Sequence, residues 1–316
     1  MDGIIASPHR GDGLLHGPGY PQTWFPVCLA RDIADDALAG VDILGTRVIV
    51  YRDGAGRAVV QSAWCPHLGA DLSQGERIEG HVRCPFHHWR FDTAGVCTHI
   101  PTGDKIPPGA RIFTFPAAEA WGLIWAFNGA APLFDPPRIP GATQAGLAIE
   151  TILRGVRGAT FALATSNGVD FQHLRTVHGV QAVAPDAISV RTYDIEYEIE
   201  TASHRHHGLI TGTNTFAQHL RVGGRDMFML FTGAPIDGDR LRSFFTIGVP
   251  KAGHTEADQH AALQALRGFT ERLISEDEPI FETMRFRRGV LVASDRYLAR
   301  FFKYVAEFPR AEPPDV

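Results

Sequence analysis

Two short stretches decide the fold, Cys65–Ser73 (CPHLGADLS) and Cys84–Trp89 (CPFHHW). Each offers one cysteine and one histidine, in the pattern C-x-H, sixteen residues, then C-x2-H. Thiolate sulfur and imidazole nitrogen suit zinc or an iron–sulfur cluster. A zinc knuckle usually spaces its ligands by about two to four residues, so a C-x-H loop is tight for zinc. The alternative is a [2Fe–2S] centre with both cysteines on one iron and both histidines on the other.

The residues around these stretches have the pattern of short strands separated by turns. Gly and Pro punctuate the chain every 8–12 residues or so, which is typical of a small all-β unit. The segment Gly129–Gly141 contains four prolines and indicates a linker between two domains. We therefore divide the chain into residues 23–130 and residues 131–316. The predicted strands of the first domain are Thr46–Tyr51, Ala58–Val60, His81–Arg83, Trp89–Phe91 and Gly122–Phe127.

The second domain has a different pattern, of long strands followed by a long helix. Apolar residues recur at helical spacing over Thr255–Arg288, and Ala162–His178 could also be helical. An antiparallel sheet curved around a long C-terminal helix is expected, which makes the fold class α+β. The predicted strands are Ile149–Arg154, Ile188–Thr201, Leu209–Leu220, Asp226–Ala234 and Leu241–Val249.

A second group of candidate metal ligands follows the linker, in the pattern N-x2-D-x2-H-x4-H from Asn167 to His178. On a helix Asp170 and His173 share a face. His178 lies five residues beyond His173, about 140° around an ideal helix, so both can bind one metal only if the helix ends or distorts between them. Gly179 supplies a plausible helix end. Alone, these residues could equally form a polar helix face.

Two histidines need a carboxylate to complete the facial triad that leaves positions open for O2 on ferrous iron. The predicted C-terminal helix offers several candidates, none of which the spacing alone selects. They are Glu271, Glu276, Asp277, Glu278 and Glu282.

The chain resembles the Rieske non-haem iron oxygenases. Roughly residues 23–130 are similar to the Rieske domain of that family. The resemblance implies that Cys65, His67, Cys84 and His87 bind a [2Fe–2S] Rieske cluster. Two positions depart from the family pattern, because Leu68 stands where the family often has Arg, and His88 where it often has Gly. The matching segments are Trp24-Phe-Pro-Val27, Cys65–Ser73, Cys84–Trp89, Gly95-Val-Cys97, Ile100-Pro101 and Trp121-Gly-Leu-Ile-Trp125.

The resemblance also implies the organisation of the second domain, a helix-grip (START-like) catalytic domain. His173, His178 and Asp277 would bind a mononuclear Fe(II), with Glu276 as the alternative carboxylate. The family further implies a homotrimer, in which the cluster of one subunit faces the iron of its neighbour. Asp170 would then bridge His173 and His87 of a neighbouring subunit as part of the catalytic machinery.

The implied activity is that of a terminal oxygenase. Electrons would come from NAD(P)H through a reductase or ferredoxin, and O2 would hydroxylate or oxidatively demethylate a small molecule. Strands rich in Phe and Met favour an apolar substrate, with aromatic molecules among the candidates. The compact chain favours a monooxygenase, with a cis-dihydroxylating dioxygenase as the alternative. Two other interpretations remain. The chain could be an electron carrier, or a non-catalytic ligand-binding protein that zinc stabilises.

Composition limits the partners and the compartment. The 30 basic and 35 acidic residues give a net charge of −5 among 316 residues, so no overall field attracts nucleic acid or an anionic membrane. The four cysteines are too few for a secreted disulfide scaffold. Without a signal-like N-terminus or a long apolar run, we expect a cytoplasmic protein.

Overall fold

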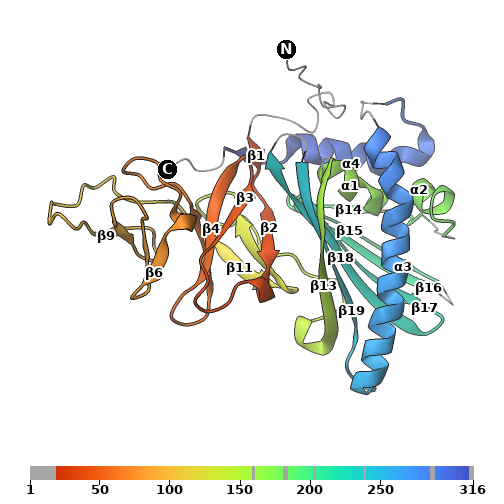
Figure 1. The fold of residues 1–316 in the computed structure, drawn as a ribbon. Helices are drawn as coiled ribbons and strands as arrows, with labels where there is room; N and C mark the ends of the chain where they lie inside the picture. The colour runs from red at the N-terminus through yellow and green to blue at the C-terminus, as the bar shows by residue number, and fades with distance from the viewer. Residues whose placement is uncertain are drawn as a thin grey trace, which may run out of the picture.

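The computed structural model describes residues 19–158, 161–180, 184–201, 204–237, 240–284 and 289–312. An all-β part built from the first third of the chain lies at one side of the molecule, and a large sheet with helices lies at the other (Figure 1). This arrangement confirms the predicted α+β class. The predicted boundary near residue 130 falls between the last strand of the first part and the first strand of the second, and the division itself stays a prediction.

The all-β part consists of three small antiparallel sheets, with strand orders β10-β5-β4-β3, β11-β12-β2 and β6-β7-β8-β9. The third sheet forms the outer tip of the molecule (Figure 1). The five strands predicted from the sequence are present, with small changes at their ends, as β4 (Thr46–Arg52), β5 (Ala58–Ser62), β7 (His81–Arg83), β8 (Arg90–Phe91) and β12 (Leu123–Phe127). The strands that were not predicted are β2 (Trp24–Leu29), β3 (Ala39–Ile43), β6 (Glu76–Ile78), β9 (Cys97–His99), β10 (Thr114–Phe115) and β11 (Ala117–Ala120).

The second part is a seven-stranded antiparallel sheet with the order β13-β19-β18-β17-β16-β15-β14. Four helices accompany it: α1 (Phe161–Ser166), α2 (Phe171–Thr176), α3 (Glu256–Thr283) and α4 (Arg296–Glu307). The long helix α3 lies across the sheet (Figure 1). A short sheet of β1 (Tyr20–Pro21) and β20 (Arg310–Ala311) joins the two ends of the described chain. The large sheet contains β13 (Leu147–Gly158), β14 (Ser189–Val190), β15 (Asp194–Glu200), β16 (His204–Thr211), β17 (Thr215–Val222), β18 (Arg225–Asp237) and β19 (Arg240–Pro250).

Helix α3 forms where the apolar periodicity predicted a helix. Thr255 caps its N-terminus, and the Thr255 and Asp258 side chains make a reciprocal capping box. Its apolar stripe, including Leu266, packs against Phe245 and Ile247 of β19. Each buried aliphatic or aromatic side chain of this kind contributes about 1.5–3 kcal/mol. This packing therefore fixes the position of α3 relative to the strands.

The structure differs from three of the predicted elements. The helix predicted over Ala162–His178 is divided into α1, a 3-10 turn at Asn167–Val169, and α2. The strand predicted over Ile188–Thr201 is a hairpin of β14 and β15. The strand predicted at Leu209–Leu220 is also a hairpin, because Gly212 takes a left-handed φ of 60° and turns the chain from β16 into β17. Helix α4 was not predicted.

The two parts share a hydrophobic core. Trp24, Trp121 and Trp125 of the all-β part pack in one cluster with Phe228 and Phe244 of the large sheet. The cluster fixes the two parts against each other. No helix among the described residues is long and apolar enough to cross a membrane.

Candidate functional site

The two cysteine–histidine loops at the tip of the all-β part have the same backbone hydrogen bonds. The N–H of Cys65 donates to the carbonyl of Ala70 at 2.9 Å, and the N–H of Gly69 donates back to Cys65 at 2.8 Å. In the second loop, Cys84 N–H donates to Trp89 at 2.8 Å and His88 N–H donates to Cys84 at 3.2 Å. The fifth residue of each loop, Gly69 and His88, has a left-handed φ of 73° and 60°. The two loops therefore share one backbone arrangement, in which the histidine is the third residue of the first loop and the fourth of the second.

The four candidate cluster ligands fall into two pairs. Cys65 and Cys84 are almost fully buried. The imidazoles of His67 and His87 are exposed, and their ring centroids lie 4.6 Å apart. Trp89 stacks on His67 with its ring centroid at 4.5 Å. Two buried thiols beside two exposed imidazoles fit a cluster whose inner iron takes sulfur and whose outer iron takes nitrogen.

The burial of Cys65 bears on what it can bind. Burial, together with the neighbouring Cys84, raises the pKa of Cys65 to about 12. Without a metal this thiol stays protonated, whereas metal binding stabilises the thiolate form. The residue types and their burial therefore fit an iron–sulfur cluster.

The second group of candidate ligands is positioned by the break in the predicted helix. Asp170 caps α2, because its Oδ1 accepts the backbone N–H of His173 at 2.9 Å. Helix α2 ends at Thr176, and Gly179 has a left-handed φ of 63°. The chain therefore leaves the helix before His178, and the expected end between the two histidines is present.

Three side chains converge where the sequence predicted a metal site. The Nε2 atoms of His173 and His178 lie 2.9 Å apart. Oδ1 of Asp277, on α3, lies 3.1 Å from the first nitrogen and 3.3 Å from the second. This Oδ1 is buried and receives no well-directed hydrogen bond within the described part of the chain. Burial opposes the ionisation of Asp277, but the two imidazoles outweigh it and lower its pKa.

The spacing of these three atoms fits one face of an octahedron. Adjacent ligands at about 2.1 Å from an octahedral ion lie about 3.0 Å apart, whereas tetrahedral ligands at that distance lie about 3.4 Å apart. The three separations of 2.9, 3.1 and 3.3 Å have a mean of 3.1 Å, which lies nearer the octahedral value. Two imidazoles and one carboxylate on one face are the ligand set of non-haem ferrous oxygenases. The residues present therefore fit a ferrous ion.

Two further side chains hold this arrangement. The Nδ1–H of His178 donates to Glu276 Oε2 at 2.7 Å, which leaves the Nε2 lone pair for a metal. Glu276 therefore supports the ligand set and does not join the three converging atoms. The Nδ2 of Asn167 lies 3.2 Å from His173 Nε2 and donates to Asp277 Oδ2 at 3.2 Å. Asn167 thus connects the α1–α2 segment to α3.

Comparison with known proteins identifies the first part of the chain. The family model of the Rieske [2Fe-2S] domain matches residues 23–116. This range contains both cysteine–histidine loops. The first part of the chain is a Rieske domain. It belongs to a protein whose relatives include terminal oxygenase components.

Two curated relatives carry the comparison beyond the Rieske domain. Cholesterol 7-desaturase nvd of Bombyx mori is 36% identical over 180 residues, 55% of this chain and 39% of that protein. Aminopyrrolnitrin oxygenase PrnD of Pseudomonas fluorescens is 31% identical over 187 residues, 54% of this chain and 49% of that protein. The chain therefore spans at most about half the length of these relatives.

The fold comparison covers nearly the whole chain. Pseudomonas putida CBB5 NdmB matches with a TM-score of 0.76 and 21% identity, over 93% of each chain. A dicamba monooxygenase structure matches with a TM-score of 0.71 and 19% identity, over 92% of this chain and 98% of that one. The chain therefore shares the fold of these two structures over nearly its whole length.

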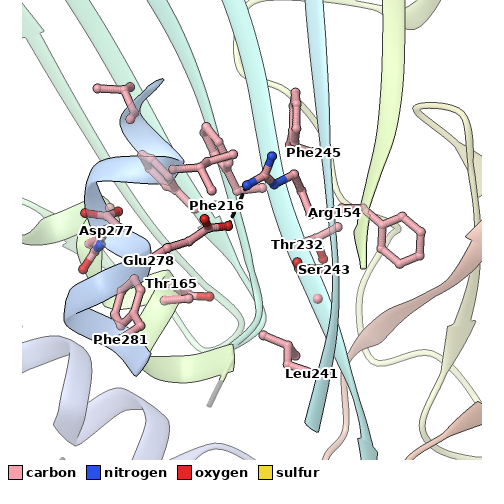
Figure 2. A pocket seen from close by; sticks show the side chains of 18 of the residues that line it. Arg154, Thr165, Phe216, Thr232, Leu241, Ser243, Phe245, Asp277, Glu278 and Phe281 are labelled. Atoms are coloured by element: carbon pink, nitrogen blue, oxygen red, sulfur yellow. Dashed lines mark hydrogen bonds and ion pairs between the residues drawn. The ribbon is translucent and has the colours of Figure 1, made fainter. Parts of the chain in front are cut away.

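A cavity of about 330 Å³ adjoins the three converging atoms, between the sheet and α3. Apolar side chains from both elements line it (Figure 2). Of the histidines on β16 and β17, His206 reaches it, whereas His207 pairs with Glu196 and His219 with Asp226. The main apolar lining residues are Phe216, Phe231, Leu241, Phe244, Phe245, Leu273, Ile274 and Phe281.

A second hollow of about 340 Å³ touches the same site from another side. Asn167, His173 and Asp277 line both hollows, so the candidate metal site lies between them. Asp170 lines the second hollow only. Asp170 therefore lies on the side of the site away from the apolar cavity.

The sequence analysis assigned no role, or a different one, to three residues of the site: Asn167, Glu276 and Arg154. Asn167 begins the quoted motif, and its spacing from Asp170 was the only signal. Glu276 was considered as a ligand, but it supports a ligand from the far side of the His178 ring. Arg154 was assigned only to a strand, and it points into the cavity (Figure 2). No sequence pattern marks Arg154, because its cavity neighbours are distant in the chain.

Proposed function

We propose that the protein is the terminal oxygenase component of a Rieske system, which oxidises an apolar small molecule with O2. The observation that carries this proposal is the convergence of His173, His178 and Asp277 beside the apolar cavity. A Rieske domain alone would only transfer electrons. A facial ligand set next to a cavity provides a place where those electrons can be used.

Each of the two metal groups would have its own role and its own ligands. When bound, the cluster would deliver single electrons received from a reductase or ferredoxin and ultimately from NAD(P)H, and the ferrous ion would activate O2. Cys65, His67, Cys84 and His87 would hold the cluster. His173, His178 and Asp277 would hold the mononuclear iron.

The chain's own residues would position and protect the reaction. Glu276 keeps the proton of His178 on Nδ1 and so orients Nε2 toward the metal position. Asn167 restrains Asp277 through its Oδ2 and leaves Oδ1 available. The aromatic walls of the cavity would exclude water and hold a substrate next to the site.

We favour monooxygenation or oxidative demethylation as the reaction. One relative is named 3-ketosteroid-9-alpha-monooxygenase and another dicamba O-demethylase, and each matches a portion of this chain. A cis-dihydroxylating reaction would use the same ligand set and is the second candidate. The apolar lining favours an uncharged, largely hydrocarbon substrate.

We propose a homotrimer in the cytoplasm as the working assembly. The cluster loops lie at one end of the molecule and α3 with Asp277 at the other, so a neighbouring subunit is needed to bring two centres together (Figure 1). The cluster end also exposes apolar surface, since Leu68 is 66% and Phe86 60% exposed. Such a surface fits a contact with another protein.

Asp170 tests this assembly. We expect Asp170→Asn to keep both metal groups but to lose most turnover, because the carboxylate would bridge His173 and His87 of the neighbouring subunit. Steady-state oxygenation, with iron content and the cluster spectrum as controls, measures it. Full activity with both metal groups intact would refute the bridging role.

The reaction itself is tested with the purified holoprotein, a surrogate reductase and a panel of aromatic and terpenoid compounds. We expect O2-dependent products that gain one oxygen atom or lose a methyl group, read by mass spectrometry with 18O2. Products with two added hydroxyl groups would select the dioxygenase. A protein that accepts electrons but consumes no O2 with any compound would be an electron carrier, and the proposal would be wrong.

A further inference from the structure

The cavity beside the candidate iron site contains one guanidinium group. Of the described residues that line it, Arg154 alone is an arginine or lysine. Its side chain lies within a wall that is otherwise largely apolar (Figure 2). A partly buried arginine in such a wall is costly unless its N–H groups find acceptors.

The backbone places Arg154 there by a β-bulge. On β13, Leu153 pairs with Phe244 and Gly155 pairs with Ser243, so Arg154 has no residue opposite it on β19. Gly155 has a φ of +91°, a value that an L-residue rarely adopts. Bulges of this kind redirect a side chain, and they are frequent next to active sites.

One donor of Arg154 is used within the protein. Its Nη2 donates to Glu278 Oε1 at 2.6 Å, across the cavity from β13 to α3 (Figure 2). The Nε atom is buried below the cavity surface, where a ligand oxygen does not reach it. A guanidinium carries five N–H donors, so within the described part of the chain the N–H groups of Nη1 and the second N–H of Nη2 are left for a ligand.

We propose that Arg154 determines substrate specificity, and that the substrate is a neutral, largely apolar molecule with a carbonyl oxygen that accepts a terminal N–H of the Arg154 guanidinium. This inference rests on the proposed function, because it assumes that the cavity holds the substrate. A carbonyl oxygen supplies the missing acceptor. The rest of such a molecule would lie against the aromatic walls.

The Glu278 contact favours a neutral carbonyl over a carboxylate. Arg154 is the only arginine or lysine among the described residues of the cavity wall, and it already pairs with Glu278. A substrate carboxylate at this guanidinium would place a second anion beside it and leave part of that charge uncompensated in the wall that the structure describes. A ketone or amide oxygen gains the charge-assisted hydrogen bond without that cost.

The Arg154–Glu278 ion pair connects the proposed carbonyl-binding group to the candidate iron site. Glu278 follows directly after Asp277 on α3. A carbonyl held by Arg154 is therefore held by a side chain that is itself tied to the helix bearing the iron ligand. The anchored carbonyl would set which carbon of the substrate faces the iron.

The test measures binding of three matched pairs to the oxidised holoprotein under argon, by isothermal titration calorimetry. Each pair consists of a ketone and its hydrocarbon: indanone and indane, tetralone and tetralin, and fluorenone and fluorene. The carboxylate of each ring system is measured as well and compared with the ketone. In the wild type we expect at least one ketone to bind about tenfold more tightly than its hydrocarbon, and no carboxylate to bind more tightly than its ketone.

The variants separate the hydrogen bond from general effects. Arg154→Met should reduce the ketone preference to about one. Because this change leaves Glu278 without its arginine, the double variant Arg154→Met/Glu278→Met removes the pair together and should give the same loss. Arg221→Met is the matched control, since Arg221 forms an ion pair with Asp226 on the same sheet outside the cavity. Its ketone preference should equal that of the wild type.

Three results would overturn the inference. They are equal or absent binding of ketone and hydrocarbon in all pairs, an unchanged preference in the double variant, and carboxylates that bind more tightly than ketones. Iron content and O2 uptake of the same preparations test the proposed function separately. A preparation with full iron and no ketone preference refutes only the role of Arg154, whereas selective binding without iron refutes only the oxygenase.

Discussion

At the scale of single residues, the site depends on a hydrogen bond that fixes one ring. Glu276 accepts Nδ1–H of His178, so the opposite nitrogen faces His173 and Asp277. Partners of this kind orient metal ligands, and their loss typically lowers metal affinity by about 10–100-fold. Of the two neighbouring acidic residues, Glu276 thus orients a ligand and Asp277 is itself a candidate ligand.

We therefore expect Glu276→Ala to lower the affinity for the mononuclear iron by at least about tenfold. Glu276→Gln should retain most of the affinity, because its amide oxygen can still accept the Nδ1–H. Competition with a chelator, followed by iron analysis, measures the affinity, while the visible spectrum monitors the cluster. Glu271→Ala on the same helix is the control. Equal iron loss in the control and in Glu276→Ala would contradict the supporting role.

Backbone strain in the cluster loops gives a second prediction at this scale. Gly69 and His88 occupy equivalent left-handed positions, and a Cβ added at Gly69 would meet no atom within 4 Å. We expect His88→Gly to stabilise the Rieske domain and Gly69→Ala to destabilise it, each by about 1 kcal/mol. Thermal melting followed by cluster absorbance measures both. Changes of the same sign would contradict the strain argument.

At the scale of elements, sequence patterns predicted five strands of the first part and the long helix, because these elements follow simple two-residue and 3.6-residue patterns between clear turns. It did not predict the break at Asn167–Val169 or the turn at Gly212, where local polar or glycine chemistry interrupts an apolar pattern. The roles of Arg154 and Glu276 were also hidden. Their partners lie 124 and 98 residues away in the chain.

The buried His206 of β16 links neighbouring elements and gives a prediction about pH. Burial, together with the nearby His204 and His207, lowers the pKa of His206 to about 3. Its Nε2 lies 3.1 Å from the hydroxyl of Tyr197 on β15, which donates to Gly168 O at 2.8 Å. Since Tyr197 uses its proton on Gly168, the neutral imidazole donates to Tyr197.

The sign of the pH effect follows from this lowered pKa. The unfolded histidine binds a proton near pH 6.5, whereas the folded one stays neutral until about pH 3, so stability is lost as the pH falls. Between pH 7 and 5 the slope is at most about 1.4 kcal/mol per pH unit for this group. Urea unfolding of the wild type and His206→Gln measures it. The variant should lose stability less steeply, and an equal slope would contradict the assignment.

At the scale of the whole molecule, the Rieske domain and the candidate iron site lie at opposite ends of one rigid unit (Figure 1). Trp24, Trp121 and Trp125 of the first part share a core with the large sheet, so the separation between the ends is built into the fold. The exposed imidazoles of the cluster loops and the hollow lined by Asp170 are the two surfaces that a trimer would bring together.

The central claim is that the chain holds a ferrous ion at His173, His178 and Asp277 in addition to the cluster. Iron analysis of the reconstituted wild type and of Asp277→Ala, with cluster absorbance recorded on both, tests it most directly. The account predicts about three irons per chain in the wild type and about two in the variant, with an unchanged cluster spectrum. Equal iron content in the two proteins would contradict it.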